Sequence, residues 1–251
     1  MHPLADLTWR ILPLTGAVEQ GLAVHPGGVA ERARWLLERL VGGLTRQGEA
    51  LEVADLTLCQ SDALLAGIYR QLYGEAIPAQ ARCGGCGAGF EIGFRLRDVE
   101  TALWQGAAEF EGAPEGRLTA PSGRVFRLPR VADLAALTDA GRDEWLRGFL
   151  VDGPFDPAAL QDEIDRAGPL LSRDIDAACP DCGKANVVRF DMAAFLGDTL
   201  AGEGPFLWRE VHLLASRYGW ALSDILGLPR KTRRQLAGFI VAEAPRTRLA
   251  S

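Results

Sequence analysis

Two widely separated cysteine pairs, each followed by glycine, constrain the fold of this chain more than any other feature. The first pair is Cys83 and Cys86, and the second is Cys179 and Cys182. Structural zinc takes four tetrahedral ligands, and a Cys-x-x-Cys turn presents two thiolates from one tight loop. One ion therefore needs two such turns, and the sequence predicts a single structural zinc ion bound by Cys83, Cys86, Cys179 and Cys182.

Other interpretations of the cysteines stay open at this stage. Two separate redox pairs would each need a thioredoxin-like βαβ context, which the sequence does not display. The pairs could also be coincidental, and a catalytic metal would require a non-cysteine ligand or an open coordination position. The 92 residues from Gly87 to Ala178 are compatible with one shared ion because loop-closure entropy grows slowly with length. The fifth cysteine, Cys59, is expected to be a small buried residue.

Composition limits the function classes that fit the chain. Its 251 residues, 48% of them hydrophobic, suffice for one substantial domain or two small ones. The net charge of -6 disfavours tight non-specific binding to nucleic acid. No apolar run approaches the length of a membrane span, and the N-terminus lacks the pattern of a signal peptide. A cytoplasmic protein with reduced thiols is expected, with no membrane partner.

The predicted fold class is α+β and mainly helical, with a zinc ribbon split by a long insertion. Residues 1–80 form a region expected to be mostly helical, with helices over 29–41, stopped by Gly42-Gly43, and over 60–73. The ribbon halves are residues 81–98 and 176–195, each with a strand after its cysteine pair, at 90–96 and 185–190. The insertion, residues 99–175, is predicted to hold a hairpin over 116–129 and helices near 131–137, 143–150 and 157–176.

Residues 203–244 are predicted to form a C-terminal helical unit. Leu207, Val211, Leu214 and Tyr218 make an apolar stripe, Gly219 ends that helix, and Ser223 is expected to cap a short second one. Pro229 precedes a last helix that is expected to bury Leu236, Phe239 and Ile240. This helix starts with the basic run 230–234, which we expect to contact an acidic protein surface, with DNA as the alternative partner.

Sequence signs of catalysis are weak. The three histidines, His2, His25 and His212, are scattered along the chain. The sequence contains no GxSxG elbow, phosphate-binding Walker loop or dinucleotide fingerprint. A zinc ion with four cysteine ligands would have no free position for a substrate. We therefore expect a non-enzymatic protein without a small-molecule substrate.

Several phrases together resemble one protein family. They are GLAVHP at 21–26, SDALLAGIYRQLYG at 61–74 leading into the first CxxCG, the distant second CxxCG, and a closing pattern E-V-H-x-L-A-x-x-Y-x-W-x-x-x-D-I-L-x-L-P matched from Glu210 to Pro229. This combination is similar to the baseplate hub assembly chaperones of contractile-tailed phages of the T-even type and of contractile injection systems. Residues 99–178 contribute little to the resemblance.

The resemblance implies an assembly factor that binds baseplate hub or spike proteins and that could remain in the finished particle. We expect the ribbon to act as a scaffold and the C-terminal unit to recognise the partner. Aromatic and arginine side chains are the usual anchors of protein interfaces. The residues expected to face the partner are Trp208, Tyr218, Trp220, Arg230, Arg233 and Arg234. Trp208 and Tyr218 could instead pack the core of their own unit, and a zinc-ribbon DNA-binding regulator is the alternative function.

Overall fold

The computed structural model describes residues 3–104, 109–113, 116–138 and 141–243, and it divides into two compact units. The hairpin unit comprises residues 1–10 and 43–195, and the helical unit comprises residues 11–42 and 196–251. The division cuts through the expected N-terminal region, because residues 11–42 belong with the C-terminal helices. Helices combine with small antiparallel sheets, so the predicted α+β class is confirmed.

The N-terminal part of the chain contains a sheet that we did not predict. Strands β1 (Leu7–Ile11), β2 (Val41–Arg46) and β3 (Glu49–Ala50) form a three-stranded sheet in the order β1-β2-β3. The helix predicted over 29–41 is present as α2 (Val29–Leu40) and ends close to Gly42-Gly43, but the expectation of a mostly helical region missed the strands that precede and follow it. Both glycines lie inside β2, which starts directly after the preceding helix.

Helix α3 (Leu58–Tyr73) is the central helix of the hairpin unit and lies where the sequence predicts a helix. Thr57 caps it by accepting a hydrogen bond from the N–H of Gln60, and the Gln60 side chain accepts from the Thr57 N–H in return. The short 3₁₀ helix η1 (Val53–Asp55) precedes it. Gly74 ends α3 with a φ of 87°, a conformation that favours glycine.

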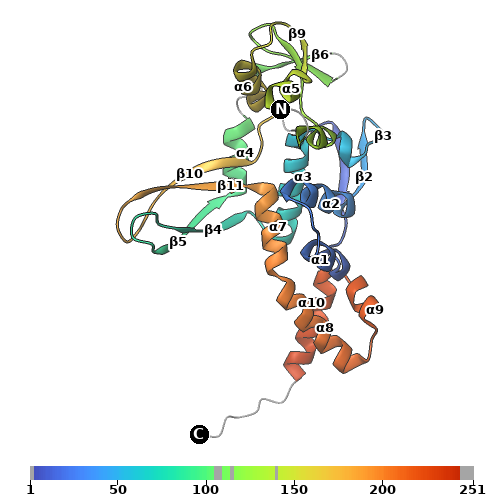
Figure 1. Ribbon diagram of the computed structural model, residues 1–251. Helices are drawn as coiled ribbons and strands as arrows, with labels where there is room; N and C mark the ends of the chain where they lie inside the picture. Colours follow the sequence, from blue (N-terminus) through green and yellow to red (C-terminus); the bar gives the residue numbers. More distant parts are fainter. Residues whose placement is uncertain (1–2, 105–108, 114–115, 139–140, 244–251) are drawn as a thin grey trace. The chain divides into compact units, whose positions relative to one another are not determined.

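Two β-hairpins, each with two seven-residue strands, carry the cysteines. Strand β4 (Ala76–Arg82) pairs with β5 (Gly89–Arg95), and β10 (Ser172–Ala178) pairs with β11 (Ala185–Asp191). Figure 1 shows the two hairpins side by side, extending away from α3. The sequence predicts only the strand after each cysteine pair, and the structure adds the strand before it. The helix predicted over 157–176 is present as α6 (Pro157–Ala167), but its predicted C-terminal part was wrong, because α6 ends before Gly168 and β10 follows.

The insertion between the hairpins has its own sheet and core. Helix α4 (Leu96–Trp104) leads to a sheet of order β6-β7-β8-β9 with strands Glu111–Ala113, Arg117–Thr119, Val125–Arg127 and Leu150–Asp152. The predicted hairpin is β7–β8, and Gly123 turns it with a φ of 84°. Phe126, Leu146 and Leu160 are buried together beneath the sheet. The remaining elements are η4 (Val131–Thr138), α5 (Arg142–Arg147) and α6.

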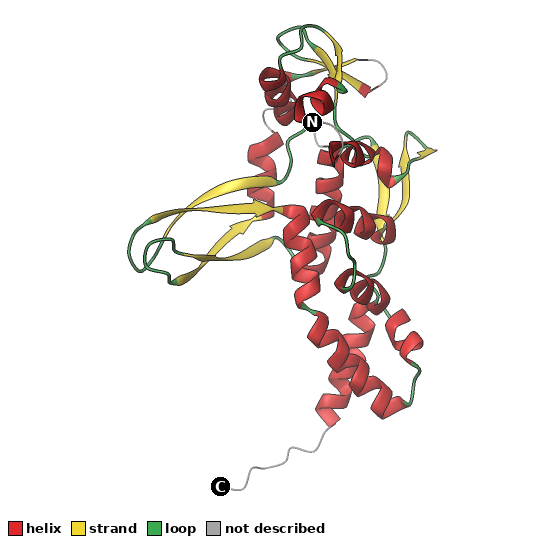
Figure 2. Cartoon of the chain, viewed as in Figure 1, coloured by secondary structure: helices red, strands yellow, loops and turns green. Residues whose placement is uncertain are grey.

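The helical unit joins helices from both ends of the chain, and Figure 2 shows its helical character. Its elements are α1 (Gly16–Ala23), α2 (Val29–Leu40), most of α7 (Met192–Gly202), α8 (Gly204–Tyr218), α9 (Leu222–Gly227) and α10 (Arg230–Glu243). Leu207, Val211 and Leu214 form the predicted core stripe with Ile225 and Leu226. Ser223 lies inside α9 and does not cap it.

Phe239 departs from its expected place in this core. Its side chain is 52% exposed, whereas Leu236 and Ile240 pack against the core as predicted. Within the described part of the chain, every helix is too short or too polar to span a lipid bilayer.

Candidate metal centre

The tips of the two hairpins bring all four predicted cysteine ligands together. The Sγ atoms of Cys83 and Cys182 lie 3.6 Å apart, those of Cys86 and Cys179 lie 3.7 Å apart, and all four sulfur atoms fall within 4.8 Å of one another. Four sulfur atoms around zinc at about 2.3 Å would be separated by about 3.8 Å. A disulfide would need about 2.05 Å. The four thiols are free, and their arrangement suits one tetrahedral metal ion.

The two cysteine turns have the same backbone hydrogen bonds, 96 residues apart. In the first, the N–H of Cys83 donates to the carbonyl of Ala88, and the N–H of Gly87 donates to the carbonyl of Cys83. In the second, the N–H of Cys179 donates to the carbonyl of Lys184, and the N–H of Gly183 donates to the carbonyl of Cys179. Gly87 and Gly183 have φ values of 75° and 73°. The glycine of each CxxCG motif is thus required by a left-handed turn that leads into β5 or β11.

Side chains of the second turn fasten it to the first. Asn186 accepts from the N–H of Gly84 at 3.0 Å, and Lys184 Nζ donates to the Gly84 carbonyl at 3.2 Å. Gly85 donates its N–H to Cys83 Sγ at 3.3 Å. A Cβ at Gly85 would lie 2.6 Å from Cδ of Lys184, so the lysine side chain would have to move to admit a larger residue there. A metal with four thiolate ligands carries net negative charge, and the Gly85 N–H together with the positive charge of Lys184 would stabilise it.

Backbone donors prepare Cys83 for metal binding. The backbone N–H groups of Cys86 and Gly85 hold the pKa of Cys83 at about 6, below the ordinary value of a thiol. Metal ligation requires the thiolate form, so this arrangement favours the ligating state. Because cysteine occupies all four positions, a bound ion would have no open site for a substrate. The arrangement is suited to a structural role.

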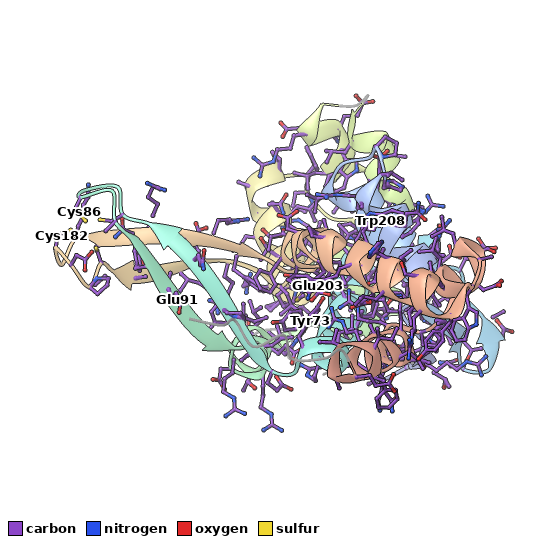
Figure 3. All side chains as sticks on the ribbon, turned by 90° about the horizontal axis from the view of Figure 1, so that it is seen from below. Tyr73, Cys86, Glu91, Cys182, Glu203 and Trp208 are labelled. Atoms are coloured by element: carbon purple, nitrogen blue, oxygen red, sulfur yellow. The ribbon has the colours of Figure 1, made fainter. Side chains whose placement is uncertain are left out.

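A row of aromatic side chains connects the hairpins to helix α3. Phe94 of β5 and Phe190 of β11 meet edge to face with centroids 5.0 Å apart. Phe190 contacts Phe195 at 5.7 Å, and Phe195 contacts Tyr69 of α3 at 5.5 Å. Figure 3 shows Cys86 and Cys182 together at the far end of the hairpins. A metal ion at the tips and the aromatic row at the base would therefore fix both ends of the paired hairpins.

A buried carboxylate lies at the base of the second hairpin. Asp62 of α3 accepts a hydrogen bond from the N–H of Leu171 at 2.9 Å, just before β10 begins. Burial, with a smaller contribution from Asp191, raises the pKa of Asp62 to about 7. The unfolded chain releases this proton near the ordinary aspartate pKa, so folding retains a proton that the unfolded state loses. The contribution of Asp62 to the free energy of unfolding is therefore fully present below about pH 4 and is lost as the pH rises to 7.

Replacing Asp62 with asparagine tests this pH dependence. Asparagine keeps an oxygen for the Leu171 N–H but cannot ionise, so it avoids burying a charge. The compared quantity is the unfolding free energy of Asp62→Asn minus that of the wild type. We expect this difference to be larger by roughly 2 kcal/mol at about pH 8 than at about pH 5.5. Urea denaturation at the two pH values measures this difference. Asp198→Asn, at a carboxylate that is 72% exposed, is the control; an Asp62→Asn difference independent of pH would contradict the explanation.

The residues expected to bind a partner are separated by the structure into exposed and buried sets. Trp208, Tyr218 and Trp220 are 47%, 41% and 41% exposed, so the alternative of core packing does not apply to Trp208 and Tyr218. Tyr218 and Trp220 stack on each other with centroids 5.0 Å apart. Trp208 lies on α8 in Figure 3. These three side chains are available for contact with another molecule.

The arginines of the basic run have a different role from the expected one. Arg233 is fully buried, and it forms ion pairs with Glu19 of α1 and with Glu210 of α8, the latter at 2.6 Å. Arg230 is also buried and contacts Glu19 and Glu203, each at 2.6 Å. The expectation that Arg230 and Arg233 face a partner was therefore wrong, because both are enclosed in this ion network.

Arg234 is the partly exposed member of the same network. Its side chain is 44% exposed and pairs with Glu203 at 2.7 Å and with Glu210 at 3.3 Å. The sequence places Glu19 more than 200 residues from its arginine partners, so local patterns could not reveal the network. The pattern matched from Glu210 to Pro229 begins with Glu210. This glutamate is the one sign in that pattern that the arginines have a buried ion-pair partner.

Comparison of the chain with protein-family models, with curated proteins and with solved structures gave no match.

Proposed function

We propose that this chain is a non-enzymatic assembly factor whose hairpin unit is organised by one structural zinc ion bound by Cys83, Cys86, Cys179 and Cys182. The observation that carries the zinc proposal is the cluster of four sulfur atoms within 4.8 Å, built from two equivalent turns. Reduced CxxC pairs with this spacing of sulfur atoms are typical structural zinc ligands. The ion would join the tips of two separate two-stranded hairpins.

We further propose that the partner is a hub or spike protein of a contractile tail. This step rests on the sequence resemblance, whose most specific part runs from Glu210 to Pro229. Packing explains many residues of that phrase, because Val211, Leu214 and Ile225 form the core of the helical unit. Packing does not explain Tyr218 and Trp220, which are exposed and stacked. An exposed aromatic pair of this kind supports a role in protein recognition.

A pulldown with purified hub and spike proteins of a contractile tail tests the proposal. We expect one of them to form a complex with the full chain, and we expect the double variant Tyr218→Ala/Trp220→Ala to weaken it by about 30-fold or more. Val187→Ala is the control, because Val187 is 65% exposed but lies on the hairpin β10–β11. The partner assignment fails if no hub or spike protein binds, and the surface assignment fails if the double variant binds as the wild type does.

The alternative of a DNA-binding regulator receives less support from the arrangement of charges. Of the basic run 230–234, Arg230 and Arg233 are buried, and Arg234 already pairs with two glutamates. Lys231 is exposed, but a single lysine offers little phosphate affinity. Titration against duplex DNA at several salt concentrations separates the two functions. Tight binding that weakens steeply with salt would favour the regulator.

A further inference from the structure

The hairpin unit contains a cavity that neither the metal centre nor the proposed protein interface uses. Its volume is about 620 Å³, within the range of small-molecule binding sites. Its walls come from the N-terminal segment, the end of β2, the start of α3, the end of α4, strands β6 to β8 and the end of α6. All of these segments belong to the same unit. The cavity is therefore built by segments that are distant in sequence.

Positive charge is concentrated in this cavity, although the whole chain is acidic. Four arginines line it, compared with two aspartates, Asp6 and Asp55. The arginines are Arg46 of β2, Arg117 of β7, Arg127 of β8 and Arg130. A third carboxylate, Asp133, forms an ion pair with Arg127 and offsets part of this positive charge. The arginines outnumber these carboxylates, and the remaining positive charge can attract an anion.

Neighbouring groups hold two of these arginines in place. Arg46 donates to Asp6 at 2.9 Å and to the Gln60 side chain at 3.0 Å. Arg127 donates to both oxygens of Asp133, at 2.7 and 3.0 Å. Fixed guanidinium groups lose less entropy when they bind an anion than free ones do.

Arg130 has the greatest capacity to bind a ligand. Its guanidinium lies 3.9 Å from Asp55, beyond hydrogen-bond distance, and the side chain of Arg130 is 44% exposed. Its backbone is fixed independently, because its N–H donates to Asp133 at 2.7 Å. A guanidinium presents a planar set of donors that match carboxylate and phosphate oxygens.

The remaining walls are apolar. Trp104, Phe110, Leu118 and Leu128 line the cavity together with the arginines. Such surfaces accommodate a ring or an aliphatic chain, and a tryptophan face can stack on a ring. Cys59 also lines the cavity, but burial raises the pKa of its thiol to about 11. The thiol therefore stays protonated and is a poor nucleophile, which favours reversible binding over covalent chemistry.

We propose that this cavity binds a small organic anion, in which a phosphate or carboxylate contacts Arg130 and Arg117 and a ring or aliphatic group packs against Trp104 and Phe110. The site goes beyond the proposed assembly function. It would couple the insertion to α3, because arginines of the insertion and the start of α3 line the same cavity.

Calorimetric titration of the full, metal-loaded chain with phenyl phosphate tests the proposal. We expect saturable binding of one molecule per chain, with benzoate as a second probe that separates carboxylate from phosphate recognition. Phenol, which lacks the anion, and inorganic phosphate, which lacks the ring, are each expected to bind more weakly. Absence of saturable binding by both phenyl phosphate and benzoate at millimolar concentration would overturn the proposal.

Arginine variants locate the binding. Arg130→Gln is expected to weaken binding of the better probe by about tenfold, the loss of one charge-assisted hydrogen bond. Arg117→Gln is a second test from another segment, and circular dichroism establishes that each variant is folded. Arg189→Gln is the control, because Arg189 is 67% exposed and lies on β11, outside the cavity. Equal affinity of the wild type and both cavity variants would place the probe elsewhere and refute the assignment.

Discussion

Arg233→Met is expected to lower the free energy of unfolding by about 3–5 kcal/mol. The substitution keeps an apolar chain of similar length but removes the guanidinium from between Glu19 and Glu210. Both carboxylates have little access to water, with side-chain exposures of 4% and 12%. Glu19 keeps Arg230 and Glu210 keeps Arg234, but both carboxylates lose their fully buried partner. Such a loss costs much more than that of a surface ion pair, because water cannot replace the buried guanidinium.

The position of Arg233 explains why the loss should reach beyond one contact. It connects α10 to α1 through Glu19 and to α8 through Glu210. The first residue of α1, Gly16, allows the approach, since a Cβ there would lie 2.8 Å from the guanidinium. We therefore expect faster hydrogen exchange in both α1 and α10 of the variant, measured by mass spectrometry, together with a lower urea midpoint.

Two further variants separate burial from charge in this test. Arg217→Met removes an exposed arginine that pairs with Glu243 at 3.3 Å, and it should cost less than about 1 kcal/mol. Adding Glu210→Gln to Arg233→Met removes one of the two carboxylates that lost this partner, and Arg234 still pairs with Glu203, so it should recover part of the lost stability. A loss in Arg233→Met no greater than that in Arg217→Met would contradict the buried-network explanation.

Cys179→Ser is expected to abolish stoichiometric zinc binding and to release the tips of the hairpins from each other. Structural zinc contributes on the order of 10 kcal/mol to small zinc-binding folds. The tips of the hairpins depend on such a contribution, since the residues packed around Cys83 and Cys179 are the small cluster Phe90, Ala81, Ile92 and Ala177, and the aromatic contact of Phe94 with Phe190 lies at the base. Treatment of the wild type with a zinc chelator should produce the same change.

The fifth cysteine supplies the matched control for this variant. Cys59 is buried beside Thr57, and its sulfur is not among the four that cluster. Cys59→Ala should therefore keep one zinc per chain, as measured by elemental analysis. Full zinc content and unchanged thermal stability in Cys179→Ser, or loss of zinc in Cys59→Ala, would refute the ligand assignment.

The cysteine cluster could be predicted because its signal is local and repeated. Each CxxCG motif encodes its own turn, and the need for four ligands brings the two turns together. Helix α3 was predictable for a similar reason, since its apolar spacing and the terminal Gly74 are both visible in the sequence. These features depend on a few neighbouring residues.

Strands β4 and β10 escaped prediction because they lack a strong apolar alternation. The sequence of β4, AIPAQAR, contains a proline and small residues, and that of β10, SRDIDAA, is mostly polar or small. Each belongs to an isolated two-stranded hairpin, whose strands are all edge strands and tolerate such residues. Pairing across the cysteine turn defines these strands, and hydrophobic periodicity does not.

The ion network was missed because its partners are remote. A basic run at the start of a helix is typical of an exposed surface, so the sequence predicts that residues 230–234 are exposed and contact a partner. Glu19 lies 214 residues from Arg233, and neither residue stands out from its neighbours. Only the packing of α1 against α8 and α9 brings the charges together. The exposed Tyr218 and Trp220 consequently remain the stronger candidates for partner contact.

X-ray absorption at the zinc edge of the intact chain identifies the atoms that coordinate the ion. We expect one zinc per chain with four sulfur neighbours at about 2.3 Å and no nitrogen or oxygen ligand. Fewer than four sulfur ligands, a nitrogen or oxygen in the coordination shell, or protein purified with zinc present that binds none would contradict this expectation.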